Sequence, residues 1–157
     1  MEFSLESSCS IRPARLSDAA EIAELSGQLG YPASEAEISD RLKRILNDRD
    51  YFVAVAEGSG GLLLGWIGAE HSLLLELGEE IEIVGLVVRQ GMRRGGVGQA
   101  LLAAVEEWAR ERGQPTIRVR SNAARVESHP FYEKMGYARV KTQHCYRKRV
   151  GPPADAA

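Results

Sequence analysis

Residues 88–101 read Val88-Arg89-Gln90-Gly91-Met92-Arg93-Arg94-Gly95-Gly96-Val97-Gly98-Gln99-Ala100-Leu101. The apolar run that ends at Val88 is typical of a strand buried on both faces. From Val97 onward, apolar residues recur at helical spacing. A strand, a loop rich in glycine and arginine, and a helix therefore follow one another, and a short strand expected at residues 116–120 completes a β-α-β unit. This unit predicts a mixed α/β protein.

The loop of this unit is suited to binding an anion. Its glycines let the backbone approach a ligand closely, and the first N–H groups of the helix lack internal partners at the positive end of the helix dipole. Arg89, Arg93 and Arg94 add cationic donors, so a pyrophosphate is the natural guest. A glycine-rich turn with solvated arginines is the alternative. A Walker A loop is excluded because no Gly-Lys precedes a Ser or Thr, and a dinucleotide fingerprint from Gly96 fails at Leu101.

The rest of the chain supplies further strands and helices. Asp18 with Glu21, and Ser34 with Glu37, match the capping box at a helix start. Strands are expected at residues 8–12, 51–57, 62–71, 80–89, 116–120, 137–140 and 142–149, and helices after Asp18, after Ser34, at 97–112 and at 128–135. Residues 73–80 fit either a longer strand or a loop. We expect about seven strands flanked by four helices in a single domain over residues 1–150, with a disordered tail at 151–157.

Composition narrows the functional class. The 157 residues suit one domain, with 44% apolar and 27% charged residues, and the net charge of −2 gives no support to nucleic-acid or membrane binding. Cys9 and Cys145 lie near opposite ends of the chain without a C-x-x-C pattern, so we expect no metal. No stretch approaches the roughly 18 apolar residues of a membrane span, and no signal peptide is evident. These features predict a reduced, cytoplasmic protein.

A family resemblance emerges from two motifs. Arg93-x-x-Gly96-x-Gly98 resembles the Arg/Gln-x-x-Gly-x-Gly/Ala acetyl-CoA motif of the GNAT superfamily of N-acetyltransferases. Downstream, Asn122 and then Phe131-Tyr132-Glu133-Lys134-Met135-Gly136-Tyr137 resemble that family's Asn…FYEKxGF block. The order of a strand, two helices and a hairpin before the motif is also similar. The resemblance spans about residues 10–149 and implies a GNAT-like fold and transfer of an acetyl group from acetyl-CoA.

The resemblance also implies how acetyl-CoA is held. The pyrophosphate would bind backbone N–H groups of Arg93, Arg94, Gly95, Gly96, Val97, Gly98 and Gln99, and the pantetheine arm would pair with the backbone of Leu86, Val87 and Val88 and bond Asn122. Such pairing requires the strand at 80–89 to splay from the one at 116–120. Gly85 marks either the bulge that causes this or a packing constraint. Gly95-Gly96 replaces the commoner Gly-Lys pair, which does not matter where backbone groups bind.

Two residues carry the chemistry that the resemblance implies. Tyr132 matches the tyrosine that protonates the departing thiolate, although a core tyrosine beside Phe131 is the alternative. Glu82 matches the position of the glutamate base in the histone-acetylating branch, and it would deprotonate the acceptor amine. It could equally be a strand-edge carboxylate, or bind a cation together with Glu80. A backbone N–H of Val87 or Val88 would stabilise the oxyanion, and Pro130 leaves the aim of Tyr132 open.

The acceptor is less well defined. Residues 121–142 resemble small members labelled aminoglycoside acetyltransferases, so a primary amine of a small molecule is expected, attacked directly without an acyl-enzyme. Tyr31-Pro32 lies where the family builds part of its acceptor pocket, and Glu70, His71, His129 and His144 are further candidates. The alternatives are a protein acetyltransferase acting on N-termini or lysines, and a non-catalytic acyl-CoA-binding sensor. A homodimer is compatible with the resemblance.

Overall fold

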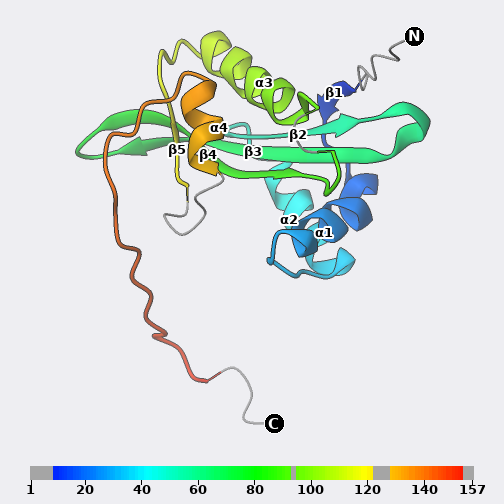
Figure 1. The fold of residues 1–157 in the computed structure, drawn as a ribbon. Helices are drawn as coiled ribbons and strands as arrows, with labels where there is room; N and C mark the ends of the chain where they lie inside the picture. Colours follow the sequence, from blue (N-terminus) through cyan, green and yellow to red (C-terminus); the bar gives the residue numbers. More distant parts are fainter. Residues whose placement is uncertain (1–8, 93–94, 122–127, 154–157) are drawn as a thin grey trace. The chain divides into compact units, whose positions relative to one another are not determined.

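Figure 1 shows the computed structural model, which describes residues 9–92, 95–121 and 128–153. The chain forms two compact units, Met1–Arg120 and Ser121–Ala157, and each is described by itself. The first contains β1 (Ser10–Pro13), η1 (Leu16–Asp18), α1 (Ala19–Gln28), α2 (Glu35–Ile45), β2 (Tyr51–Glu57), η2 (Ser59–Gly61), β3 (Leu63–Leu74), β4 (Gly78–Val88), α3 (Val97–Glu111) and β5 (Ile117–Val119). The second contains α4 (Ser128–Lys134). The expectation of one domain over residues 1–150 stays a prediction.

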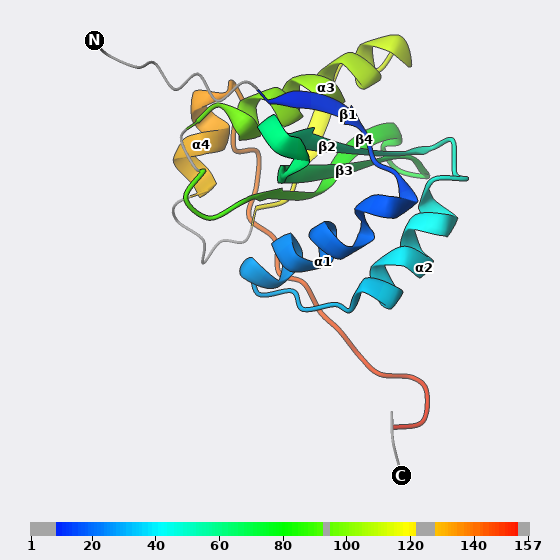
Figure 2. The same ribbon diagram turned by 90° about the vertical axis from the view of Figure 1, so that its right-hand side faces the viewer.

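A single sheet organises the first unit. Its strands lie in the order β1-β2-β3-β4-β5, antiparallel from β1 to β4 and parallel between β4 and β5. The helices α1 and α2 cover one face and α3 covers the other, as Figures 1 and 2 show from two directions. The parallel pair follows from the α3 crossover, which returns the chain to the same end of the sheet. The predicted mixed α/β class is confirmed.

Both faces of the sheet are apolar where helices cover them. Ile22 and Leu25 of α1 and Leu42 of α2 form one buried cluster with side chains that include Val55 and Val87. On the other face α3 buries its own apolar stripe, Val97, Leu101, Leu102, Val105 and Ala109. Full burial of one such aliphatic side chain contributes about 1.5–3 kcal/mol. The two layers therefore hold β4, whose residues form the site, between packed helices.

The start of α2 confirms one expected cap, and the start of α1 corrects another. At α2 the Glu37 amide donates to Ser34 Oγ (3.1 Å), and the Ser34 amide donates to Glu37 Oε1 (3.2 Å). The predicted box of Asp18 with Glu21 was wrong, since Asp18 makes no side-chain cap bond to α1. Its buried carboxylate instead accepts two bonds from the Arg12 guanidinium, each 2.8 Å long. The Arg12 guanidinium, six residues earlier on β1, bonds both carboxylate oxygens, which one cap amide does not.

The hairpin between β3 and β4 resolves the ambiguity at residues 73–80. The strand continues to Leu74, residues 75–77 turn, and β4 starts at Gly78. The strands expected at 137–140 and 142–149 were wrong, because residues 137–150 contain neither helix nor strand. The count is five strands in the described residues, not seven. A strand forms only where its backbone is hydrogen-bonded to a neighbouring strand, and residues 137–150 pair with no described strand. An alternating pattern alone is therefore not enough to predict a strand.

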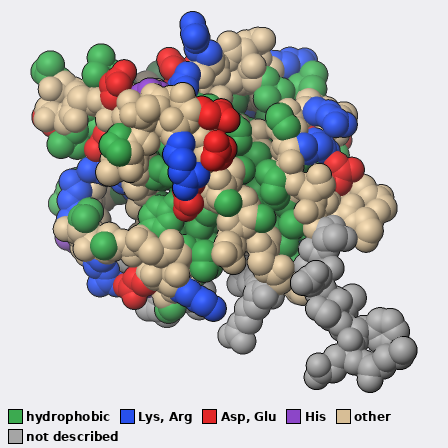
Figure 3. Space-filling view, turned by 90° about the horizontal axis from the view of Figure 1, so that it is seen from above, with side chains coloured by type: hydrophobic (Ala, Val, Ile, Leu, Met, Phe, Trp, Pro, Cys, Tyr) green, Lys and Arg blue, Asp and Glu red, His purple; other side chains and the backbone are tan. Residues whose placement is uncertain are grey.

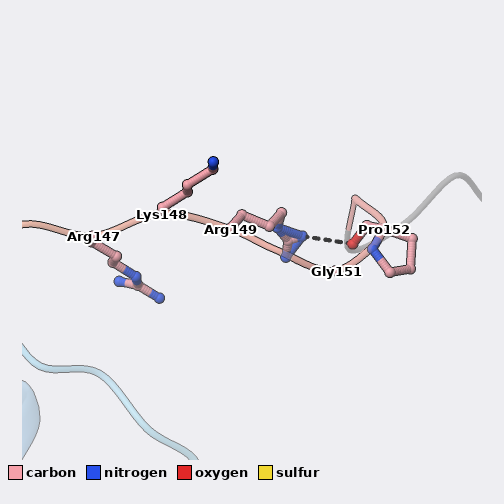
Figure 4. A pocket seen from close by; sticks show the side chains of 5 residues that line it. All are labelled: Arg147, Lys148, Arg149, Gly151 and Pro152. Atoms are coloured by element: carbon pink, nitrogen blue, oxygen red, sulfur yellow. Dashed lines mark hydrogen bonds between the residues drawn. The ribbon is translucent and has the colours of Figure 1, made fainter.

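In the second unit, Pro130 lies in the first turn of α4, as expected of a proline that would break a helix interior. The basic residues Arg147, Lys148 and Arg149 are exposed, and Figure 4 shows them along an extended segment, with Arg149 donating to the carbonyl of Pro152 (3.1 Å). A strand was expected over residues 142–149, and these three side chains lie instead on an exposed segment without strand structure.

In the part of the chain that the structure describes, no helix has the length and apolar character to cross a bilayer.

Candidate active site

A bulge in β4 shapes the centre of the candidate site. Gly68 of β3 pairs with Gly85 of β4, whereas the next residue, Ala69, pairs with Ile83. Val84 is therefore the extra residue of the bulge, and its side chain is exposed. Gly85 meets a packing constraint as well, since a Cβ there would lie 2.6 Å from the Trp66 ring. The sequence offered a bulge or a packing constraint as the reason for Gly85. The structure shows a bulge, at the preceding residue Val84, and a packing constraint at Gly85 itself.

The bulge coincides with the point where β4 and β5 separate. The parallel pairing covers only Ile81, Glu82 and Ile83 of β4, opposite Ile117–Val119. Beyond it, Leu86, Val87 and Val88 pair with β3 on one edge. Within the described residues, no strand pairs with their other edge. The separation expected from the sequence is present, and it leaves a strand edge whose amides and carbonyls can accept an extended ligand.

The loop after β4 leads directly into α3. Gly96 is the N-cap residue of α3 with φ of 82°, a left-handed conformation that favours glycine. A Cβ at Gly96 would meet no described atom within 4 Å. The first helical hydrogen bond runs from the Ala100 amide to the Gly96 carbonyl (3.0 Å), so the amides of Val97, Gly98 and Gln99 precede it. Arg93 and Arg94 lie outside the described residues.

Glu82 lies at the separation of β4 and β5 and is 8% exposed. Arg120, just past the end of β5, places its Nε 2.6 Å from Glu82 Oε1. One step along the same strand face, Arg118 Nη2 lies 3.4 Å from Glu80 Oε1. The two ion pairs tie β5 to β4 where backbone pairing is only three residues long. Sequence reasoning missed these partners, although glutamates and arginines at a spacing of two on the two strands were the available signal.

A row of polar residues crosses the sheet beside Glu82. Tyr51 pairs with Glu70 across β2 and β3, and Glu70 pairs with Glu82 across β3 and β4, so all three share one face. Trp66, four residues before Glu70, packs on the cluster formed with α1 and α2, which identifies that face. Burial raises the pKa of the Tyr51 phenol, and the charge of Glu70 raises it further. The row is therefore partly desolvated and acidic.

Tyr132 lies in the second unit, on α4. Its ring makes edge contacts with Phe131 and Tyr137, at centroid distances of 5.3 and 6.1 Å. The Tyr137 amide donates to the Tyr132 carbonyl (3.0 Å), which closes the end of the helix. These contacts fit the core-tyrosine alternative and leave the acid role as a prediction. Asn122 lies outside the described residues.

Among the described residues no group of three His, Cys, Asp or Glu side chains could hold a metal ion. Figure 3 shows one face of the molecule, where acidic and basic side chains are interspersed rather than gathered by sign. The chemistry available at β4 consists of a buried carboxylate, an acidic row and a strand edge.

Comparison with known proteins identifies the class. A sequence model of the acetyltransferase (GNAT) family matches residues 18–137, so the chain belongs to this family and is an acetyl-CoA-dependent N-acetyltransferase, as predicted. It is 32% identical over 84 residues to the uncharacterized N-acetyltransferase YhdJ of Bacillus subtilis, covering 53% of this chain and 58% of that protein. It is 27% identical to the aminoglycoside N(6')-acetyltransferase type 1 of Stenotrophomonas maltophilia, covering 96% of this chain and 99% of that protein.

Solved structures agree on the fold. A GNAT family acetyltransferase of Staphylococcus aureus has a TM-score of 0.71 at 26% identity and covers 91% of this chain and 99% of its own. The aminoglycoside acetyltransferase AAC(6')-Iy, solved in complex with CoA, has a TM-score of 0.81 at 20% identity and covers 91% of this chain and 96% of its own. The sequence-based assignment to the family is confirmed.

Proposed function

We propose that this protein acetylates a primary amine of a small molecule, with Glu82 as general base and Tyr132 as general acid. The observation that carries the proposal is the place of Glu82, buried beside the point where β4 leaves β5. A carboxylate on the same strand as the exposed edge of residues 86–88 would face the carbonyl carbon of a donor paired along that edge. The family supplies the donor, acetyl-CoA.

The donor would be held mainly by backbone groups. Leu86, Val87 and Val88 would pair with the pantetheine amides as an added strand does. The pyrophosphate would bind the loop Arg93–Gly98 and the amide of Gln99, and Asn122 would bond the pantetheine arm. The left-handed Gly96 and the early amides of α3 support this assignment, because close approach of an anion needs both.

The reaction would proceed by direct attack. Glu82 takes a proton from the acceptor ammonium, directly or through water, and the freed lone pair forms the C–N bond. An amide N–H of Val87 or Val88 donates to the oxyanion of the tetrahedral intermediate. The C–S bond then breaks, and the departing thiolate takes a proton from the Tyr132 hydroxyl. The nitrogen, which still carries one proton more than an amide does, releases it through solvent to the Tyr132 phenolate and so restores the phenol. Glu82 passes its proton to solvent, and no acyl-enzyme forms.

The acceptor would bind the acidic row of the sheet. Glu80 and Glu82 form ion pairs with arginines of the β5 segment. Glu70 lies on β3, between Glu82 of β4 and the partly desolvated Tyr51 of β2. A carboxylate beside an aromatic ring attracts an ammonium group through charge and through the ring face. The relative from Stenotrophomonas maltophilia that matches over nearly its full length is named for aminoglycosides, which are small molecules, and this favours a small-molecule acceptor over a protein.

A screen of amines tests the proposal. Purified protein is incubated with acetyl-CoA and a panel of amino sugars, diamines, lysine peptides and N-terminal peptides, with thiol release and product mass measured together. Turnover is expected with small amines carrying more than one amino group. Turnover confined to peptides would refute the small-molecule acceptor. CoA binding without turnover of any amine would refute the catalytic proposal itself.

A further inference from the structure

Arg89, the first residue after β4, points into the protein although it begins the loop proposed to hold pyrophosphate. Its side chain is 13% exposed. Nε donates to the carbonyl of Leu63 (2.8 Å) and Nη1 donates to Glu24 Oε1 (3.0 Å). Nη2 lies 3.6 Å from Glu21 Oε2. Arg89 is therefore committed to β3 and α1, and the sequence expectation that it would contribute charge to an anion was wrong.

The neighbouring backbone is fixed by the same helix and by β3. The Gln90 amide donates to Gln28 Oε1 (3.2 Å), and the Arg89 amide donates to the Leu64 carbonyl (2.7 Å). Glu21, Glu24 and Gln28 are three and seven residues apart, so they share one face of α1. One helix face thus holds the first two residues of the loop in place.

Arginine suits this place better than lysine. Its planar fork reaches a backbone carbonyl and two carboxylates at once, whereas a lysine ammonium is a point charge on a flexible stem. A buried cation also requires paired acidic partners to offset desolvation. Glu21 serves twice, since its Oε2 also accepts from the Leu63 amide (2.8 Å). The arrangement joins β3, β4 and α1 at one guanidinium.

We propose that Arg89 is a positioning residue for acetyl-CoA. By fixing the base of the loop on α1, it holds the backbone amides that follow near their ligand-bound arrangement. A glycine-rich loop loses much conformational entropy when it orders, so anchoring its base beforehand lowers the cost of binding. The inference rests on the proposed donor-binding role of the loop, and it is independent of the acceptor and of Glu82 and Tyr132.

Arg89→Met, which keeps the aliphatic stem, is the direct test. We expect the KM for acetyl-CoA and the Kd for CoA to rise about tenfold, equivalent to about 1.4 kcal/mol. The kcat at saturating acetyl-CoA should hold, because Arg89 touches no reacting atom. Arg89→Lys should recover part of the affinity. The matched control is Arg110→Met, which removes an exposed ion pair with Glu107 within α3 and should change neither constant.

Three results separate the interpretations. If Arg89→Met lowers only the active fraction and leaves the Kd for CoA unchanged, Arg89 is merely structural and the inference is overturned. If Gly96→Val binds CoA as tightly as the wild type does, the donor role of the loop fails instead. Should Arg89→Met not fold, Glu24→Gln removes a single partner whose side chain is 57% exposed. It should raise the Kd for CoA about threefold, or about 0.6 kcal/mol, and an unchanged Kd would overturn the proposal.

Discussion

The substitution Glu82→Gln separates a catalytic carboxylate from a structural one. Glutamine keeps the shape of the side chain but removes the charge that would accept a proton. If Glu82 is the base, kcat should fall by about 10²–10⁴, the usual contribution of general base catalysis. This corresponds to roughly 2.7–5.4 kcal/mol of transition-state stabilisation. The acceptor KM should change little, whereas loss of a counter-ion would raise KM and preserve kcat.

The structure bounds the competing structural effect. Arg120 is 71% exposed in its side chain, so its charge returns to water when Glu82 is neutralised. An ion pair with one solvated partner contributes about 0–1 kcal/mol to stability. The expected loss of stability is therefore smaller than the expected loss of transition-state stabilisation. A Glu82→Gln variant with a slightly lower melting temperature and a kcat reduced a hundredfold would indicate a general base. It would not be explained by the loss of an ion pair between β4 and β5.

Glu80→Gln is the matched control, since Glu80 lies two residues away on the same strand face and pairs with Arg118 in the same manner. Both variants are assayed by stopped-flow thiol release at saturating acetyl-CoA from pH 6 to 10. The Glu82→Gln deficit should shrink as pH rises toward the ammonium pKa of about 10.4, where free amine becomes available. Equal kcat for the two variants at neutral pH would refute the base role and leave Glu82 as an inter-strand tie.

Tyr132→Phe should lower kcat by about 10²–10⁴ while calorimetry shows unchanged CoA affinity, and an unchanged kcat would return Tyr132 to a packing role. Glu70→Gln should raise the acceptor KM about tenfold with kcat retained, and steady-state kinetics with the best amine would contradict this if KM stays constant. Burial opposes ionisation of Asp18, but bonds from Arg12 and the Arg15 amide outweigh it and lower the Asp18 pKa. The stability from this pair should therefore be present above about pH 4 and be lost as pH falls further, and Asp18→Asn should flatten that loss in acid melting curves.

The sequence predicted best where one local pattern decides the structure. The sequence pattern predicts a strand that ends near Val88, a glycine-rich loop and an amphipathic helix that begins at Val97, and the structure ends β4 at Val88 and begins α3 at Val97. The cap at Ser34 is likewise decided by residues three apart. Asp18 illustrates the limit. Its partner Arg12 lies six residues earlier on β1, outside the three-residue spacing that defines a capping box, so the capping rule does not identify this pair.

The strands expected at 137–140 and 142–149 failed for a related reason. Alternation indicates which residues would share a face, but a strand forms only against a neighbour, and a pattern in one segment does not specify that neighbour. The roles of Arg89 and Arg120 were missed similarly. Arginines beside a glycine loop suggest an anion, yet Arg89 turns to α1 because Glu21 and Glu24 stand opposite it.

The bulge at Val84 explains why Glu82 and the core share a face. Glu82 and Val87 are five residues apart, an odd number, so a regular strand would point them to opposite faces of the sheet. Cross-strand pairing places both on the α1 and α2 side, Glu82 through Glu70 and Val87 through Trp66. The extra residue Val84 shifts the alternation of β4 by one position, and it lies immediately after Ile83, the last residue of β4 that pairs with β5. One inserted residue thus sets the register that lets β4 contribute a core residue, a buried carboxylate and an unpaired edge, and the alternation of the sequence does not reveal it.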